Sequence, residues 1–249
     1  MQIWKISILK PYEMTLLNLI KYELKWRLRE PLTLCFILTP VLLSALVLFD
    51  ILPERLVSFY EFYKYSEALY FSTMQISTYI WLVMIVSVLA KNYREKTIFL
   101  SLPANKIEQW SAIVISLLVI SAIYFINLAT FLYLANLLTA KEIAINPLHM
   151  LLTFLSSGGS LIVFLALSAN IRKVFLFIIL SFLIIIAPSL VKSISGYFIG
   201  NFLLLPYFNC NDIPARLIYF FKYYLPIYYV LSFFIGYAGY RKTNIGYEI

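Results

Sequence analysis

The chain has 249 residues, of which 62% are hydrophobic and only 13% are charged. Since soluble domains are about 45–50% apolar and about 25% charged, this composition excludes an ordinary soluble domain and indicates a membrane protein with several spans. The net charge of +8 is accounted for by basic residues on cytoplasmic loops, which orient membrane helices, so no nucleic-acid partner is expected.

Residues 14–30 are the first predicted element, an amphipathic helix that Pro31 ends. Leucine and isoleucine recur on one stripe at helical spacing, beside a stripe of basic and polar residues. The segment is too charged to cross a bilayer and suits the cytoplasmic headgroup layer, either as a general basic anchor or as part of a docking surface. Its predicted interfacial anchor residues are Lys21, Lys25, Trp26 and Arg29.

Six apolar blocks follow, and each is close to the ~20 residues that cross a hydrocarbon layer of ~30 Å. The third is long enough to tilt, and the fifth, which is as short as the sixth, contains Pro188. We therefore expect one all-α, polytopic transmembrane domain over residues 1–249. The predicted spans are residues 32–50, 69–90, 111–137, 150–169, 174–191 and 223–240.

The distribution of Lys and Arg sets the predicted topology. No cleavable signal peptide is expected within residues 1–30, which lack a continuous apolar core and a small-residue cleavage site. With the N-terminus inside, the cytoplasmic segments carry 14 Lys and Arg and the external segments carry 6. Because basic residues accumulate on the cytoplasmic side, both termini are predicted to be cytoplasmic in a multi-pass plasma-membrane protein.

Residues 192–222 form an unusual external segment, because they are apolar but contain two glycines and two prolines. The segment is too interrupted to be one span and too apolar to be a free loop. Irregular backbone at membrane depth must be buried in protein. We therefore predict a re-entrant hairpin directly before the last span.

The predicted spans lack the residues that chemistry inside a membrane requires. An ion-coupled carrier normally needs buried acids or histidines near the midplane, and the interiors of the six blocks carry none. No P-loop, HExxH motif or paired-aspartate set occurs. Cys35 and Cys210 fall in different predicted compartments, and His149 has no nearby ligand partner. We therefore expect no enzyme activity in the chain itself and no directly bound cofactor or metal.

Mild polar residues remain inside the spans. We interpret them mainly as helix-packing positions, above all the SSGGS run at 156–160. A pathway lined by such residues and by aromatic side chains, without charge, would suit an amphipathic cargo. The predicted lining residues are Asn127, Thr130, Ser156 and Ser160.

Residues 91–110 form the longest polar interruption between two long apolar blocks. Their basic residues place the segment in the cytoplasm, and the stretch from Thr97 to Leu102 is amphipathic before Pro103 interrupts it. Since the chain has no energy source of its own, this short helix is the predicted docking place for a cytoplasmic partner. The alternative is a solvated loop that only fixes orientation.

Taken in order, these features resemble the membrane subunit of a type-2 ABC exporter. The basic helix that leads to Arg29, Glu30 and Pro31 is similar to the interfacial elbow helix of that family. The six spans with both termini inside, and the broken apolar hairpin before the last span, are also similar. The likeness covers essentially the whole chain.

The cytoplasmic segment adds a motif to this resemblance. Glu95, Thr97, Leu100 and Pro103 are similar, in a compact form, to the E-x-x-x-T-x-x-x-L-x-x-x-P pattern of the family. Lys96 departs from the pattern, since members often have Gly just before the Thr. This departure weakens the motif but leaves the amphipathic helix intact.

The resemblance implies a half-transporter. Two such subunits, identical or paralogous, would form the translocation pathway, and each would rest on a separate cytoplasmic ATPase subunit that binds ATP and Mg²⁺. The resemblance also implies a coupling helix over residues 94–103 that sits in a groove of that ATPase. The residues that it assigns to ATPase coupling are Arg94, Glu95, Thr97, Leu100 and Pro103.

The cargo and three other classes of function stay open. The resemblance implies export of an amphipathic or hydrophobic cargo, such as a peptide, a drug or a lipid-like molecule. A haem-exporter-like subunit of cytochrome c maturation would share the architecture and change the cargo. A non-transporting membrane scaffold or immunity protein would need only the spans and a docking surface. A secondary carrier is disfavoured by the missing intramembrane charges.

Overall fold

The computed structural model is helical over nearly all of the residues that it describes. These residues contain no strand, which confirms the expected all-α fold for this part of the chain. The predicted coupling segment 94–103 lies outside the described residues, as does 196–216, the greater part of the predicted hairpin. The described residues are 15–48, 65–91, 104–139, 147–171, 173–195, 217–218 and 220–242.

The described residues form eight principal helical elements. The fifth predicted span lies within a helix that continues through position 188, and the last predicted span is divided between a π-helix and an α-helix that follows it directly. The elements are α1 (Leu16–Arg27), α2 (Pro31–Leu48), α4 (Tyr65–Lys91), α6 (Lys106–Thr139), α7 (Pro147–Asn170), α8 (Val174–Ser195), η4 (Phe220–Leu231) and α10 (Ser232–Lys242).

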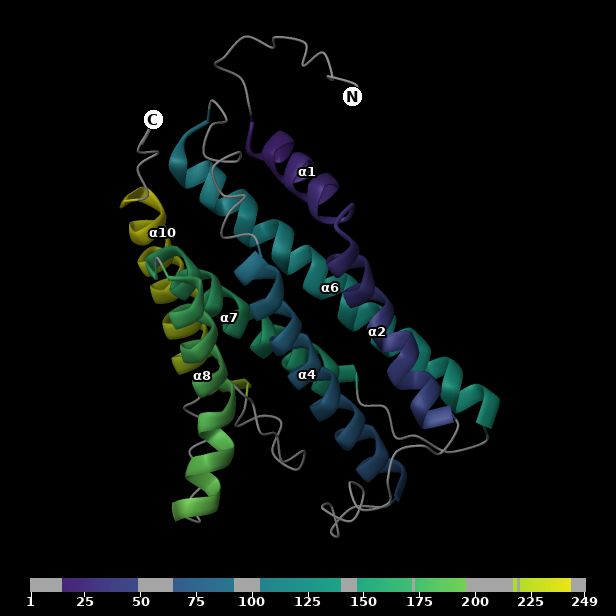
Figure 1. Cartoon of the computed structure of the whole chain (residues 1–249). Helices are drawn as coiled ribbons and strands as arrows, with labels where there is room; N and C mark the ends of the chain where they lie inside the picture. The colour runs from purple at the N-terminus through teal and green to yellow at the C-terminus, as the bar shows by residue number, and fades with distance from the viewer. Residues whose placement is uncertain are drawn as a thin grey trace.

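The helices form a bundle in which successive long elements run in opposite directions (Figure 1). α1 and α2 follow one another along α6, separated by a short turn at 28–30. α7 packs against α10, η4, α4 and α6, so α6 and α7 lie at the centre of the bundle. Thr15 and Lys242, the first and last described residues, lie at the same end of the bundle, as an even number of passages requires.

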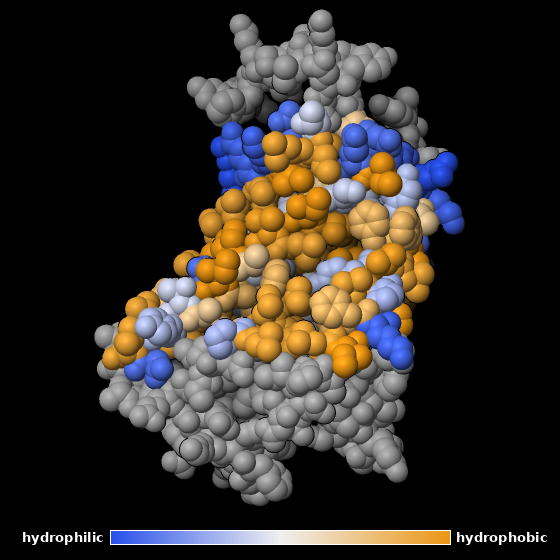
Figure 2. Space-filling model, turned by 180° about the vertical axis from the view of Figure 1, so that it is seen from behind, coloured by the Kyte–Doolittle hydropathy of each residue, from blue (hydrophilic) through white to orange (hydrophobic). Residues whose placement is uncertain are grey.

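Within the part of the chain that the structure describes, two helices are long and apolar enough to cross a membrane. They cover Lys106–Leu134 in α6 and Met150–Asn170 in α7. Shorter apolar stretches among the described residues are Thr33–Leu42, Ile76–Ala90 and Val174–Ile185. Figure 2 shows a broad hydrophobic band across the visible face, with hydrophilic residues gathered above it. A band of this kind suits burial in a hydrocarbon layer.

Aromatic packing holds α4 against α6. Trp81 is almost fully buried, and its ring lies 4.9 Å from that of Tyr124, measured between centroids. The Tyr124 hydroxyl is 2.8 Å from the Ser77 hydroxyl and donates to the Ser77 carbonyl at 3.1 Å. A buried tyrosine usually finds a hydrogen-bond partner for its hydroxyl, and this pairing fixes the register of the two helices.

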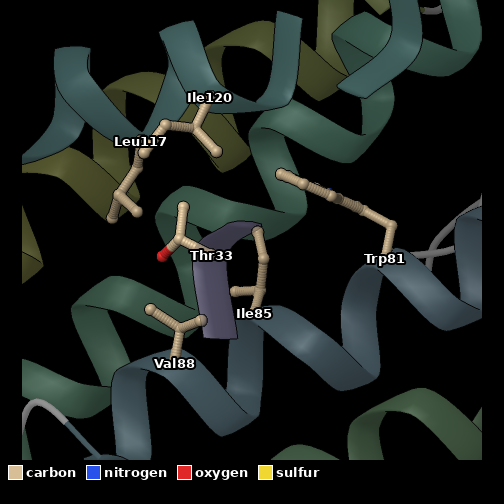
Figure 3. A pocket seen from close by; sticks show the side chains of 6 residues that line it. All are labelled: Thr33, Trp81, Ile85, Val88, Leu117 and Ile120. Atoms are coloured by element: carbon tan, nitrogen blue, oxygen red, sulfur yellow. The ribbon is translucent and has the colours of Figure 1, made fainter. Parts of the chain in front are cut away.

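A small cavity lies where α2, α4 and α6 meet (Figure 3). It has room for about one water molecule. Thr33 is the polar residue in its wall, and the buried Thr33 Oγ1 has no hydrogen-bond partner within the described part of the structure. The other lining residues are Trp81, Ile85, Val88, Leu117 and Ile120.

Thr33→Val should raise the stability of the bundle. An unpartnered buried hydroxyl costs about 1–3 kcal/mol, and valine keeps nearly the same shape without that cost. The matched control is Thr39→Val in the same helix, because Thr39 Oγ1 donates to the Cys35 carbonyl at 2.9 Å. Thermal unfolding in detergent, followed by circular dichroism, should show a higher midpoint for Thr33→Val only. A lower midpoint for both variants would contradict the conclusion that the Thr33 hydroxyl is buried without a hydrogen-bond partner.

Candidate functional site

A buried ion pair lies on the inner face of α1. Arg27 Nε donates to Glu23 Oε1 at 2.7 Å, and Arg27 Nη2 lies 2.6 Å from the same oxygen. Glu23 is only 3% exposed and Arg27 only 4% exposed, because α1 lies along α6. Taking two charges out of water is costly unless they remain paired and hydrogen-bonded, so the two side chains must remain together when α1 is in place.

The first turns of α6 face the last turns of α10 at the same end of the bundle. The Tyr240 hydroxyl donates to Gln109 Oε1 at 3.0 Å, and the Trp110 indole donates to the Phe233 carbonyl at 3.1 Å. The Trp110 and Tyr240 rings lie 5.5 Å apart between centroids. α1 packs along α6 at this end of the bundle, and its ion pair is buried in that packing (Figure 1). We call Glu23, Arg27, Gln109, Trp110 and Tyr240 the terminal joint.

Two glycines allow the backbone of α10 to pack closely against side chains of α6 and α7. A Cβ atom on Gly236 would lie 2.3 Å from Trp110 Cζ2, and one on Gly239 would lie 2.6 Å from side-chain atoms of Asn170. Asn170 Nδ2 in turn donates to the Ile235 carbonyl at 3.2 Å. The ends of α6, α7 and α10 are therefore fastened to one another.

The terminal joint follows the predicted coupling segment closely along the chain. The described residues resume at Ala104, directly after Pro103, and Gln109 Nε2 donates to the Ala104 carbonyl at 3.4 Å. Lys106 Nζ donates to the Arg241 carbonyl at 3.1 Å, which adds a further link to α10. A force applied to residues 94–103 would therefore reach the start of α6 within a few residues. There α6 is hydrogen-bonded to α10, and α1 packs along α6.

The terminal joint could not be predicted from the sequence. Its signal in the sequence was the spacing of Glu23 and Arg27, four residues apart, which favours an ion pair on one helix face. Nothing in the sequence pairs Gln109 with Tyr240, since they are 131 residues apart and meet only in the folded bundle.

The predicted anchor residues lie mostly on the opposite side of α1. Lys21, Lys25 and Arg29 are exposed. Trp26 is half-buried, and its ring lies 5.6 Å from the Arg27 guanidinium carbon, an arrangement that permits a cation–π contact. α1 therefore has a paired, protein-facing side and a basic outer side.

The four predicted pathway residues fall into separate places. Ser156 and Ser160 are buried on α7 against η4. Asn127 on α6 donates through Nδ2 to the Ile37 carbonyl of α2 at 3.3 Å. Thr130 is exposed, and its hydroxyl donates to the Ile126 carbonyl one turn earlier. Within one chain these residues do not line a common surface.

The SSGGS run holds tyrosines of the last helical segment. The Tyr224 hydroxyl donates to the Ser156 carbonyl at 2.6 Å, and the Tyr229 hydroxyl donates to the Leu155 carbonyl. A Cβ atom on Gly159 would lie 2.6 Å from Tyr224 Cε1, and one on Gly158 would lie 2.6 Å from the Tyr229 hydroxyl. Glycine is therefore needed at both positions for the tyrosines to reach the carbonyls of α7, as a packing role predicts.

The π-helical form of η4 explains how two tyrosines five residues apart reach the same helix. In an α-helix, residues five apart point about 140° away from each other. The i→i+5 hydrogen bonding of a π-helix brings such residues near one face. Tyr224 and Tyr229 can thus both contact α7 in the observed structure.

Comparisons with known proteins leave the family undetermined, since no family model, curated protein or solved structure matches the chain. Among the described residues, no group of three His, Cys, Asp or Glu side chains is placed to hold a metal ion. What the site defines is an all-helical bundle with helices able to cross a membrane and a buried polar joint at one end.

Proposed function

We propose that the chain is the permease half-subunit of an ATP-driven exporter. A separate cytoplasmic ATPase subunit supplies the energy, and a second permease subunit completes the pathway. In this arrangement six spans cross the plasma membrane, both termini lie in the cytoplasm, and the end of the bundle that carries the terminal joint faces the cytoplasm.

The observation that carries the proposal is the position of the terminal joint. It begins within a few residues of the segment that resembles a coupling helix. Buried polar contacts join α6 to α10 there, and α1 packs along α6 with its own ion pair buried. A device that transmits force needs elements that move as one body, because packed cores are bistable and resist gradual deformation. The joint supplies such a connection between the proposed docking segment and the bundle.

The proposed mechanism follows from this connection. Closure of the ATPase subunits on ATP displaces residues 94–103, and the start of α6 moves with them. Through Gln109 and Tyr240 the displacement reaches α10, and through Trp110 it reaches the neighbouring turn at Phe233. α1 moves with α6 because it packs along that helix with its ion pair buried. The bundle then tilts as a unit against the second subunit.

A pathway without charge favours an amphipathic or hydrophobic cargo, such as a peptide, a drug or a lipid-like molecule. No charged residue lies in the interior of the predicted spans. A haem-exporter-like role would use the same architecture, so cargo identity is a question for transport assays with candidate substrates.

Changing the coupling segment should break association with the ATPase. Glu95→Ala combined with Leu100→Ala removes a charged and an apolar contact from the proposed docking helix. When the tagged full-length chain is purified from its own cells in mild detergent, the parent should retain a P-loop ATPase. The double variant should retain at least tenfold less, since the loss of about 1.4 kcal/mol already changes an equilibrium tenfold.

The control for this experiment is Lys222→Gln, an exposed position in the first turn of η4, which should leave ATPase retention unchanged. Absence of any P-loop ATPase from the parent, or equal retention by the double variant, would favour a scaffold or immunity protein. Transport that survives ATP depletion and follows an ion gradient would instead indicate a secondary carrier.

A further inference from the structure

The outer face of α1 is cationic at its centre and apolar at its edges. Lys21 and Lys25 are exposed and lie one turn apart, as their spacing of four residues requires. Leu17, which is 59% exposed, lies on one flank, and Tyr22, which is 40% exposed, lies on the other. A face of this kind differs from a water-facing helix surface, because large apolar groups surround the charges.

Within α1 and the turn that follows it, the acidic side chains are buried and do not lie among the exposed basic ones. Glu23 is the single acid of α1, and it is buried in the ion pair with Arg27. Glu30, the next acid along the chain, is only 8% exposed. Arg29 in the turn after α1 is exposed and extends the basic row. The side of α1 that faces away from the bundle therefore carries positive charge only.

An apolar surface continues directly from this basic row. α2 begins only a few residues after α1 and exposes Leu34, Leu38 and Leu42, whose spacing of four residues places them along one stripe. Basic side chains followed along the chain by exposed leucines match the order of layers in a bilayer, with phosphates outside and acyl chains inside. Lysine and arginine side chains reach the phosphates while their methylene groups remain in the apolar layer.

We propose that the outer face of α1, formed by Leu17, Lys21, Tyr22, Lys25 and Arg29, binds the headgroups of anionic phospholipids. The inference rests on the membrane placement proposed above and does not depend on the ATPase. Anionic headgroups complement the exposed positive charge, and the apolar flanks enter the acyl boundary beneath them. A zwitterionic bilayer would bury the apolar flanks but would not attract the basic side chains electrostatically. An acidic protein would attract the basic side chains but would leave the exposed leucines of α2 without a partner.

The test measures which lipids the full-length chain retains. The chain is reconstituted into phosphatidylcholine vesicles that contain a minor fraction of phosphatidylglycerol, and the protein is re-extracted in mild detergent. The ratio of the two lipids bound to the protein is compared with that in the vesicle. Each basic residue near an anionic surface contributes roughly a fivefold preference at low salt. The parent chain should therefore be enriched in phosphatidylglycerol at least several-fold, and high salt should reduce the enrichment.

The decisive variant replaces Lys21, Lys25 and Arg29 with glutamine. Its control is Lys222→Gln, an exposed position in the first turn of η4. The triple variant should lose the enrichment and keep the thermal midpoint of the parent in phosphatidylcholine, because all three side chains are exposed. The control should keep the enrichment. Equal retention of both lipids by the parent, or unchanged enrichment in the triple variant, would overturn the proposal. Loss of the preference in Lys222→Gln would also overturn it, because the effect would then not belong to α1. Failure of ATPase docking would alter none of these outcomes.

Discussion

Arg27→Met should lower the stability of the bundle by about 3–5 kcal/mol, because it leaves the Glu23 carboxylate buried without its partner. The methionine fills much of the space of the arginine stem, so the loss arises from the unpaired charge. Thermal unfolding of the full-length chain in detergent should show a clearly lower midpoint. Because the pair is buried where α1 packs on α6, the variant should also weaken the packing of α1 on α6.

A second variant separates charge from packing. Combining Arg27→Met with Glu23→Leu removes both charges and replaces them with apolar side chains of similar size. Replacing both members of a buried pair in this way is often neutral or stabilising. The double variant should therefore recover most of the midpoint that Arg27→Met loses. A double variant as unstable as the single one would show that the arginine matters through other contacts.

Gly236→Val should disrupt the contact between α10 and α6. Even a Cβ at this position would lie 2.3 Å from Trp110 Cζ2 and 3.1 Å from the Ala166 backbone, so neither side offers room. Overpacking a close contact typically costs about 1–3 kcal/mol, and valine adds two methyl groups beyond the Cβ. The expected result is a lower thermal midpoint together with a shift in Trp fluorescence, because Trp110 loses its buried position.

The control is Ala238→Val on the same helix. Ala238 is exposed, so the added methyl groups meet no packed neighbour, and the midpoint should stay close to that of the parent. If Gly236→Val left both the midpoint and the fluorescence unchanged, the close approach of α10 to Trp110 would be wrong. If the two variants were equally unstable, the effect would lie in α10 itself and not in its contact.

Much of the helical framework followed from the pattern of apolar runs. The block expected at 150–169 lies inside α7, and the block expected at 111–137 lies inside α6. Long apolar stretches satisfy their backbone internally only as helices or closed barrels, so length and hydropathy are strong signals. Pro31 was expected to end the first helix. In the structure α1 ends at Arg27, and Pro31 is the first residue of α2, a position that proline favours.

The contacts between helices did not follow from the sequence, for identifiable reasons. The wheel of α1 shows an amphipathic helix, but it does not show that the ion pair of Glu23 and Arg27 faces the protein. Helical periodicity places Tyr224 and Tyr229 on different faces, whereas the π-helix brings both to α7. The serines at 156 and 160 were expected both as packing positions and as lining residues, and hydrogen bonds with Tyr224 place them in a helix seam.

The two faces of α1 give that helix a double task in this account. Its inner face, which carries the buried ion pair, packs on α6, while its outer face holds basic side chains toward the lipid headgroups. A force applied at residues 94–103 would then move a bundle whose end is guided along the membrane surface. This arrangement predicts that lipid binding and ATPase coupling can be removed separately.

The most direct test of the central claim is site-specific photo-crosslinking in intact cells. A photoreactive amino acid is placed at Leu100 in the proposed coupling segment and, as a control, at Tyr60 in the segment predicted to be external. If residues 94–103 dock on the ATPase, position 100 should crosslink to a cytoplasmic P-loop ATPase and position 60 should not. Failure of position 100 to reach any ATPase, or labelling of position 100 from outside the cell, would contradict it.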